Sequence, residues 1–518
     1  MIPGAIPRLA FYADVVLKCQ DSEFTPTNGL GATTMAKIPA KFVTVILAVL
    51  VGVEAIALVE EALAPDIAVG AFSFQSITSE AFLVLAPFSP LLIILVLYSW
   101  VGRILLKVVS RYDAHGILAR RFQFLSRVSQ SLPVSWDGSG VLLLSRPLVV
   151  LAIGIAASCI LAFTPYRLDL NPVGVPVGVD APEYILWVNQ MLRRSPSAAL
   201  AYAFSQASNG SRPLSLIFPY IVSGLFGVPA DVSVKFYPLF LAPLLVVSSF
   251  LFVYLGCGDK RTAGLVGLMT AFSFQFTVGM WAGYYANWLA LAESYLLLGI
   301  LVRFTNSGCK TSFLAIAILS IALLFTHPWT WDLVLLLSVV FMTERWVRSG
   351  KFSQLRFPVL LVIVNVVADS VKSLALGGYG GGRAGLDIAT SSLGFPQFLA
   401  LWPNVVALFV QNYNELMADS LVLGLALIVI WRTPLASGNF SRLLITWTGL
   451  ASLPFLFLGS LLQTRIVYFL PIPVLASAAL LGLQGGLGRT QRALILSLVL
   501  LYEADYALAS MQQVLPLP

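Results

Sequence analysis

The chain of 518 residues is 58% hydrophobic and only 11% charged, whereas a soluble domain carries about 25% charged residues. This composition excludes a water-soluble globular protein, because too few polar side chains remain to cover its surface. The excess of Lys and Arg over Asp and Glu, 31 against 24, is typical of the cytoplasmic loops of a membrane protein, and we do not interpret it as a nucleic-acid-binding surface.

Apolar runs near the roughly 20 residues that cross a bilayer recur along the whole chain. The runs are continuous in Leu, Val, Ile, Ala and Phe, which favours helices over a barrel of alternating strands. We therefore predict an all-α bundle of about thirteen transmembrane helices, at 42–60, 84–107, 147–164, 236–256, 262–281, 284–304, 312–327, 329–343, 357–371, 418–432, 442–461, 466–484 and 493–510.

Charge predicts the topology of these spans. The stretch at 61–80 carries acids without Lys or Arg and is expected outside, whereas the Arg-rich connection at 111–146 is expected in the cytoplasm. Clusters of Lys and Arg later in the chain are also expected in the cytoplasm. They face it only if two short apolar segments, 214–229 and 396–411, do not cross the membrane. Both are therefore predicted to be juxtamembrane or interfacial helices, with the N-terminus inside and the C-terminus outside.

Six parts follow from this topology. They are a polar tail at 1–40, an accessory transmembrane hairpin at 41–110, a basic cytoplasmic loop at 111–146, a transmembrane core at 147–371 with an outer loop at 165–235, a glycine-rich outer loop with an interfacial helix at 372–417, and C-terminal transmembrane helices at 418–518. Met35 opens the segment just before the first apolar run and is a candidate start, so residues 1–34 are expected to be either a tail or the result of a misassigned start codon. The scattered cysteines and histidines predict neither a disulfide framework nor a zinc site.

Chemistry is expected in the outer loop at 165–235. It contains "RLDLNPVGVPVGVDAPEYILWVNQMLRR", with Asp169, Asp180 and Glu183 just beyond a membrane span. Acids in a water-facing loop can be merely solubilising. Asp180, however, precedes "APEY" where a helix opens, so its carboxylate can cap free N–H groups and still face the membrane surface. A reaction on a lipid-linked substrate needs a base at that height.

The segment "VDAPEYILWVNQM" resembles the acidic motif in the first large outer loop of GT-C superfamily glycosyltransferases. This class includes protein O-mannosyltransferases, aminoarabinose transferases and oligosaccharyltransferase catalytic subunits. Later segments are similar to further elements of the family, in the family's order, over about residues 147–484: "SRPLSLIFPYIVSGLFG", "KRTAGLVGLMTAFSFQFTVGMWAGYYANWLALAESYLLL" and "TRIVYFLPIPVLASAALL". The resemblance implies a GT-C-like architecture and the transfer of a sugar from a polyprenyl-phosphate lipid to a protein, lipid or glycan acceptor outside the plasma membrane.

The family's acidic residue maps onto Asp180, which the resemblance implies as the general base. Glu183 lies one helical turn later and is expected to assist, and Asp169 is the alternative base. A phosphate leaving group also needs cations, because charge builds on it in the transition state. Arg465, at the outer end of a span, is the first choice for this role unless it only snorkels to the interface, and Arg212 is the second.

The other expected substrate contacts are Tyr184, Tyr468, His327, Asn287 and Arg383. His327 adjoins a helix-breaking proline in "FTHPWTWD", and a structural hydrogen bond is its alternative role. Asn287 stands where some GT-C enzymes have a second acid. Because a divalent cation needs several oxygen ligands and few fixed ones are seen here, no cofactor is predicted, although a divalent cation stays open. The intramembrane Glu293 is expected to pair with a buried donor.

The glycine-rich segment "KSLALGGYGGGRAGLDIATSS" is expected to be flexible, either as a linker or as a lid over substrate with Lys372, Arg383 and Asp387 as its contacts. A different function also fits the composition. Intramembrane acids can line the pathway of a transporter or flippase, although no inverted repeat is found. A non-catalytic assembly subunit is the third alternative.

Overall fold

The computed structural model describes residues 40–63, 145–349, 354–391, 425–426, 438–455, 468–483, 487–512 and 514. The chain divides into two compact units, Met1–Val43 and Thr44–Pro518. Of the first unit, only the start of helix α2 (Ala40–Leu63) is described, and all other described residues belong to the second. All regular secondary structure in the described ranges is helical, which confirms the predicted fold class at this level.

Seven stretches of the described residues are long and apolar enough to cross a membrane. They are Lys41–Glu60, Pro147–Tyr166, Ala230–Cys257, Lys260–Ala282, Tyr285–Ser307, Arg356–Ala375 and Arg489–Gln512. Each coincides with a span predicted from the sequence, which supports a membrane protein. The predicted span at 84–107 and most of the one at 418–432 lie outside the described residues. So do the tail, the basic loop up to residue 144 and the interfacial piece at 396–411.

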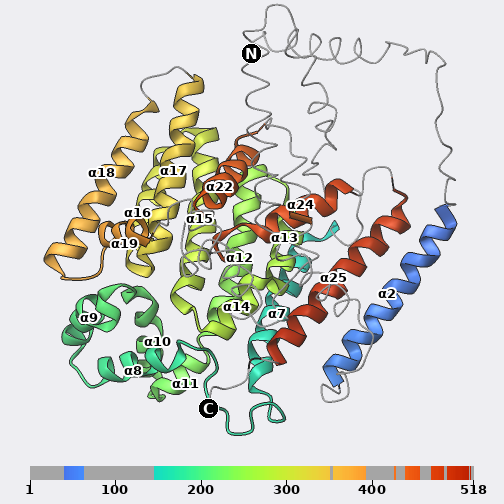
Figure 1. Ribbon diagram of the computed structural model, residues 1–518, viewed down its shortest axis with the longest axis horizontal. Helices are drawn as coiled ribbons and strands as arrows, with labels where there is room; N and C mark the ends of the chain where they lie inside the picture. The colour runs from blue at the N-terminus through green and yellow to red at the C-terminus, as the bar shows by residue number, and fades with distance from the viewer. Residues whose placement is uncertain are drawn as a thin grey trace, which may run out of the picture. The chain divides into compact units, whose positions relative to one another are not determined.

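Four long helices form the centre of this unit (Figure 1). Helix α12 (Pro238–Cys257) packs against α7 (Pro147–Phe163), α13 (Lys260–Phe272) and α15 (Tyr285–Ser307). Glycines bring these backbones close together. A Cβ at Gly154 would lie 3.2 Å from the Cα of Leu268, and one at Gly299 would lie 2.9 Å from the Cα of Phe252. Small residues at helix crossings are the usual means of packing helices within a membrane.

The remaining helices pack around these four. They are α14 (Phe274–Ala282), α16 (Lys310–Thr326), α17 (Pro328–Ser349), α18 (Arg356–Ser370), α22 (Asn439–Phe455), α24 (Ile472–Leu483) and α25 (Arg489–Gln512). Helix α14 prolongs α13 after a break at Ser273, where the backbone is extended with ψ of 159°. His327 forms the corresponding break between α16 and α17.

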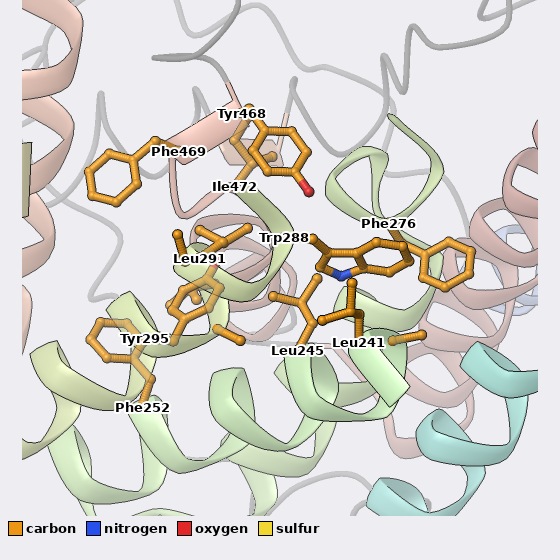
Figure 2. Packing of buried hydrophobic residues seen from close by; sticks show 14 of the residues in the cluster. Leu241, Leu245, Phe252, Phe276, Trp288, Leu291, Tyr295, Tyr468, Phe469 and Ile472 are labelled. Carbon is orange, nitrogen blue, oxygen red and sulfur yellow. The ribbon is translucent and has the colours of Figure 1, made fainter. Parts of the chain in front are cut away.

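An aromatic layer fills the core between these helices. Figure 2 shows Trp288 of α15 beside Phe276 of α14 and close to Leu241 of α12. The rings of Trp288 and Phe276 meet edge to face at 5.3 Å, a favourable arrangement of two aromatic quadrupoles. Both side chains are almost completely buried. The layer therefore supports the turn between α14 and α15, on which the candidate site is built.

After the 3₁₀ turn η4 (Thr164–Tyr166), which directly follows α7, five short helices lie before α12 in the chain. They are α8 (Ala181–Leu192), α9 (Pro196–Ser205), the 3₁₀ turn η5 (Ala207–Gly210), α10 (Pro213–Phe226) and α11 (Ala230–Lys235). Helix α10 has 14 residues. It is therefore about 21 Å long and too short for the roughly 30 Å of bilayer hydrocarbon. The prediction that the 214–229 segment does not cross stays a prediction, because α16, with 17 residues, is also shorter than the bilayer and coincides with a predicted span.

The glycine-rich segment after Lys372 was predicted to be flexible, and this is wrong for the part that is described. The chain leaves α18 through a π-helical turn, η7 (Val371–Ala375), and then forms α19 (Gly381–Ser391). A Cβ at Gly378 would lie 2.8 Å from the carbonyl oxygen of Phe204, and one at Gly381 would overlap the ring of Trp331. These glycines permit close packing, which their lack of a side chain allows as readily as it allows flexibility.

Candidate functional site

The loop that carries Asp180 is fixed to the turn between α14 and α15. The backbone N–H of Val179 donates to the Trp281 carbonyl at 3.1 Å, and that of Asp180 donates to the Ala282 carbonyl at 3.0 Å. Gly178 and Gly283 face each other across this junction, and a Cβ at Gly178 would lie 2.9 Å from the Cα of Gly283. The structure thus joins two segments that the sequence singled out separately, "VDAPEY" and "WAGYYAN".

Asp180 occupies the N-cap position of α8, but its side chain does not cap the helix. The predicted capping role is therefore wrong, and the backbone shows why. The N–H of Ala181 donates to Gly178, residue 182 is a proline without an N–H, and the N–H groups of Glu183 and Tyr184 reach the Asp180 carbonyl at 3.1 and 3.3 Å. The first turn needs no further acceptor, so the carboxylate is left for other contacts.

The carboxylate of Asp180 faces Arg212. Nη1 of Arg212 lies 3.5 Å from Oδ2 of Asp180 and also donates to the Tyr184 hydroxyl at 3.4 Å. Tyr184 is completely buried, and its hydroxyl accepts the backbone N–H of Ala286 at 3.0 Å. Three residues predicted to be functional therefore meet in one cluster, in which Tyr184 ties the outer loop to the start of α15.

The guanidinium of Arg212 is well suited to hold an anion. Its side chain is 20% exposed, against 27% for Asp180. Burial lowers the pKa of Arg212, but the neighbouring Tyr184, Asp180 and Glu183 outweigh it, so the pKa is raised and the cation persists. Its Nε is buried and has no hydrogen-bond acceptor among the described residues. A guanidinium offers five donors, and the long contacts to Asp180 and Tyr184 use few of them.

The other two predicted acids lie apart from this contact. Glu183 is exposed in the first turn of α8, where its charge acts on Arg212 only through space. Asp169 is exposed and forms an ion pair with Arg167 at 2.7 Å, and this hydrogen-bonded neighbour lowers the pKa of Asp169. Because an arginine already occupies its carboxylate, Asp169 is the weaker candidate for a base.

A second cluster brings together three more of the predicted substrate contacts. Asn287, His327 and Tyr468 line one small pocket, and the rest of its wall is formed by Leu291, Trp329, Thr330, Leu333 and Phe469. The wall thus combines aromatic faces with an amide, an imidazole and hydroxyl groups. Such a mixture can stack against the apolar face of a polar ring and hydrogen-bond its edge.

The orientation of His327 follows from its neighbours. The backbone N–H of Thr330 donates to Nδ1 of His327 at 3.3 Å, and the Thr330 hydroxyl lies 2.8 Å from the same atom. Because Nδ1 accepts a hydrogen bond, the proton of the neutral imidazole belongs on Nε2. The preceding Thr326 donates its hydroxyl to Glu293 at 2.9 Å, which confirms that Glu293 pairs with a buried donor.

Tyr468 reaches the pocket because Gln275 holds the chain beside it. The Gln275 amide donates to the carbonyls of Tyr468 and Leu470 at 2.9 and 2.8 Å, and it accepts from the Tyr295 hydroxyl at 3.2 Å. Tyr468 also meets the ring of Tyr284 edge on at 6.4 Å. The α14–α15 turn therefore contacts both clusters, through Gly283 at the backbone of Asp180 and through Tyr284 at Tyr468.

Of the other predicted cations, Arg383 does not join these clusters. Arg465 lies outside the described residues. Arg383 is exposed on α19, where its guanidinium stacks over Tyr379 at 5.4 Å, and the Tyr379 hydroxyl donates to Asp387. Lys372, expected in a mobile lid, is completely buried and cannot contact substrate from a loop. Among the residues that the structure describes, no group of three or more His, Cys, Asp or Glu side chains is placed to hold a metal ion.

The sequence analysis missed the glycines that build this site. Gly178 and Gly283 have φ of +108° and +66°, conformations that other residues rarely adopt. The sequence did contain a signal for them, because Gly178 directly precedes "VDAPEY" and Gly283 lies within "WAGYYAN". Comparison with models of known protein families gave no match, and neither did comparison with functionally characterised proteins.

Proposed function

We propose that this protein is a membrane glycosyltransferase of GT-C architecture, with thirteen spans and an active site on the outer face of the plasma membrane. It transfers a sugar from a polyprenyl-phosphate lipid to an acceptor on that side. The proposal takes the topology from the distribution of charge and the reaction class from the resemblance of the "VDAPEY" segment. The cluster around Asp180 supplies the chemical argument.

One observation carries the proposal. A partly exposed carboxylate, Asp180, lies 3.5 Å from the more buried guanidinium of Arg212, on a loop that backbone hydrogen bonds fix to the helical bundle. Transfer from a sugar phosphate needs both groups. A base must take the proton of the acceptor, and a cation must stabilise the charge that develops on the departing phosphate.

In the proposed reaction, the Asp180 carboxylate takes the proton of the acceptor while the acceptor atom attacks the anomeric carbon. The bond from that carbon to the phosphate oxygen breaks, and the electron pair leaves with the polyprenyl phosphate. Arg212 binds this phosphate through the guanidinium donors that its contacts with Asp180 and Tyr184 leave unused. The width of the guanidinium then separates the phosphate from Asp180, which leaves room for the sugar between base and leaving group.

In this structure the pocket around His327 is only about the size of a water molecule, and it is proposed to widen in order to hold the sugar ring. Trp329 and Tyr468 offer aromatic faces, and Asn287 and His327 offer hydrogen-bonding groups for its hydroxyls. Asn287 follows Ala286, whose N–H binds the Tyr184 hydroxyl of the Asp180 cluster. Consecutive residues at the start of α15 therefore contact the Asp180 cluster and line the pocket.

Transport is the second candidate, and one observation favours it. Glu54, Glu503 and Asp505 are almost fully buried on helices that can span the membrane. Acids at such positions mark the pathways of many transporters. The two functions differ in what they require: a transferase works in detergent solution, whereas transport needs a sealed vesicle. Sugar transfer by detergent-purified protein from a labelled polyprenyl-phosphate sugar would decide between them.

Asp180→Asn tests the proposed base directly. The change keeps the shape of the side chain but removes its charge and basicity, so transfer should fall about 10²- to 10⁴-fold. The affinity for the donor lipid should largely survive, because the carboxylate acts on the acceptor. Asp169→Asn is the matched control on the same loop and should have a mild effect.

Three outcomes of this experiment are distinct. Loss of transfer in Asp180→Asn alone supports the assignment. Loss in Asp169→Asn with near-normal transfer in Asp180→Asn would move the base to Asp169. If neither variant loses transfer although both are folded, neither Asp180 nor Asp169 is the base, whereas absence of transfer by the unsubstituted protein overturns the glycosyltransferase proposal.

A further inference from the structure

Lys372 is completely buried, which is unusual for a lysine. It lies in the π-helical turn η7, where α18 ends. Its Nζ donates to the carbonyl of Leu324 at 2.6 Å and to the carbonyl of Ser211 at 3.2 Å, and it lies 5.2 Å from the centre of the Phe325 ring. Burial of an ammonium group is costly unless its donors are used, and these contacts use two of the three.

The two carbonyls belong to different parts of the candidate site. Ser211 directly precedes Arg212, and Leu324 belongs to the last turn of α16, three residues before His327. One ammonium group therefore joins the chain next to the proposed phosphate-binding arginine to the helix end next to the sugar pocket. Asp369, one turn earlier on α18, is engaged elsewhere, because its carboxylate accepts the N–H groups of Gly381 and Gly382 at 2.6 and 2.9 Å.

The chain just before Arg212 is strained, and this explains why it needs such support. Ser208, Asn209 and Gly210 all have positive φ, at 48°, 55° and 66°. Non-glycine residues persist in this conformation only where the surroundings hold them. The same glycine-rich chain supplies a second restraint: the N–H of Tyr379 donates to the Asn209 carbonyl at 2.7 Å.

We propose that Lys372 is a positioning residue, which holds the 207–211 segment against the end of α16 and thereby sets Arg212 beside Asp180. The placement of Lys372 in a π-helical turn fits this role, since π-helical turns occur often at functional sites. Lys372 touches no substrate and acts through Arg212. The effect on catalysis rests on the proposed function, whereas the effect on the 207–211 segment does not.

Lys372→Met tests the restraint without any assay of function. Methionine is similar in length and apolar, so the helix should still insert, but both hydrogen bonds are lost. The probe is Ala207→Cys, a small change at a side chain that is 1% exposed, in a background without the native cysteines. Its rate of alkylation should rise at least about tenfold in the Lys372→Met protein as the segment opens. A cysteine at the buried Ala199 in α9 should keep its rate, which shows that the opening is local.

The second test asks whether Lys372 acts through Arg212. Lys372→Met alone should lower the kcat of transfer about 10- to 100-fold, since small displacements of a catalytic group have effects of that size. In an Arg212→Ala protein, Lys372→Met should lower kcat by a further factor of less than about three, because the guanidinium that Lys372 positions is already absent. Lys310→Met, at an exposed lysine on the opposite end of α16, is the control and should not affect transfer.

Each failure has its own meaning. An unchanged alkylation rate at residue 207 overturns the inference, whether or not the protein is a transferase. The inference is also overturned if alkylation increases but the losses of transfer in the two single variants multiply in the double variant. Lys372 would then act independently of Arg212. Should Lys372→Met aggregate, Lys372→Gln, a shorter side chain whose amide keeps two N–H donors, replaces it, and its alkylation rate at residue 207 must still exceed that of the unsubstituted protein. Failure of the proposed function appears instead as absence of sugar transfer by the unsubstituted protein.

Discussion

Substitution of Gly283 by alanine tests whether the Asp180 loop is docked as described. Gly283 has φ of 66° and ψ of 29°, and a Cβ there would lie 3.0 Å from the backbone nitrogen of Asp180 and 3.1 Å from that of Ala181. The chain offers a matched control. Gly227 has almost the same conformation, with φ of 65° and ψ of 21°, but a Cβ there would meet nothing within 4 Å.

The difference between the two variants isolates the contact with the loop. An alanine in the left-handed conformation costs about 1–2 kcal/mol at either position. Crowding of a packed site adds about 1–3 kcal/mol, and it applies to Gly283→Ala alone. We therefore expect Gly283→Ala to be destabilised by about 2–5 kcal/mol and Gly227→Ala by about 1–2 kcal/mol. Thermal unfolding in detergent should rank them in that order.

Transfer should separate the two variants further. The added methyl group displaces the backbone of Asp180, and transfer should fall about 10- to 100-fold in Gly283→Ala, because catalysis is sensitive to displacements below 1 Å. Gly227→Ala should keep its activity within about twofold, since it touches no part of the site. Equal stability and equal activity of the two variants would refute the docking of residues 178–181 on the α14–α15 turn.

Two further predictions concern the phosphate site and the topology. Arg212→Lys should impair transfer almost as much as Arg212→Ala, because a point charge does not reproduce a guanidinium fork, and full activity of the lysine variant would reduce Arg212 to a general electrostatic contributor. In a cysteine-free protein in whole cells, Pro176→Cys and Gly385→Cys should react with an impermeant reagent, and Leu125→Cys and Gly350→Cys only after permeabilisation. Reaction of Leu125→Cys from outside would overturn the topology and the assignment of the catalytic loop.

Hydropathy predicted the long helices well, because length and apolar composition suffice to recognise a span. The span expected at 147–164 is the helix Pro147–Phe163. Hydropathy did not predict local breaks in the helices. The span expected at 262–281 is interrupted at Ser273, whose extended conformation starts α14 as a separate helix. Nothing in the apolar pattern distinguishes such a break from a continuous helix.

The candidate site was predicted in its residue types but not in its contacts. Asp180, Tyr184 and Arg212 were named separately, and only the fold brings them together. The glycine-rich segment was predicted to be flexible, but glycine also allows close packing of the backbone, and the sequence alone does not distinguish these two roles. Lys372 was misassigned for the same reason. Its burial depends on carbonyls of Ser211 and Leu324, which are distant in the sequence.

The contacts of Lys372 also bear on how the protein is made. A lysine near the middle of a membrane helix opposes insertion by about 2.5–3.5 kcal/mol, and by less near the end, where Lys372 lies in the Arg356–Ala375 stretch. Both carbonyls that receive its ammonium group, those of Ser211 and Leu324, precede it in the chain. A nascent chain that leaves the ribosome from its N-terminus has therefore already delivered these acceptors when Lys372 emerges. Biosynthesis can stabilise this helix in the membrane before the last helices are translated.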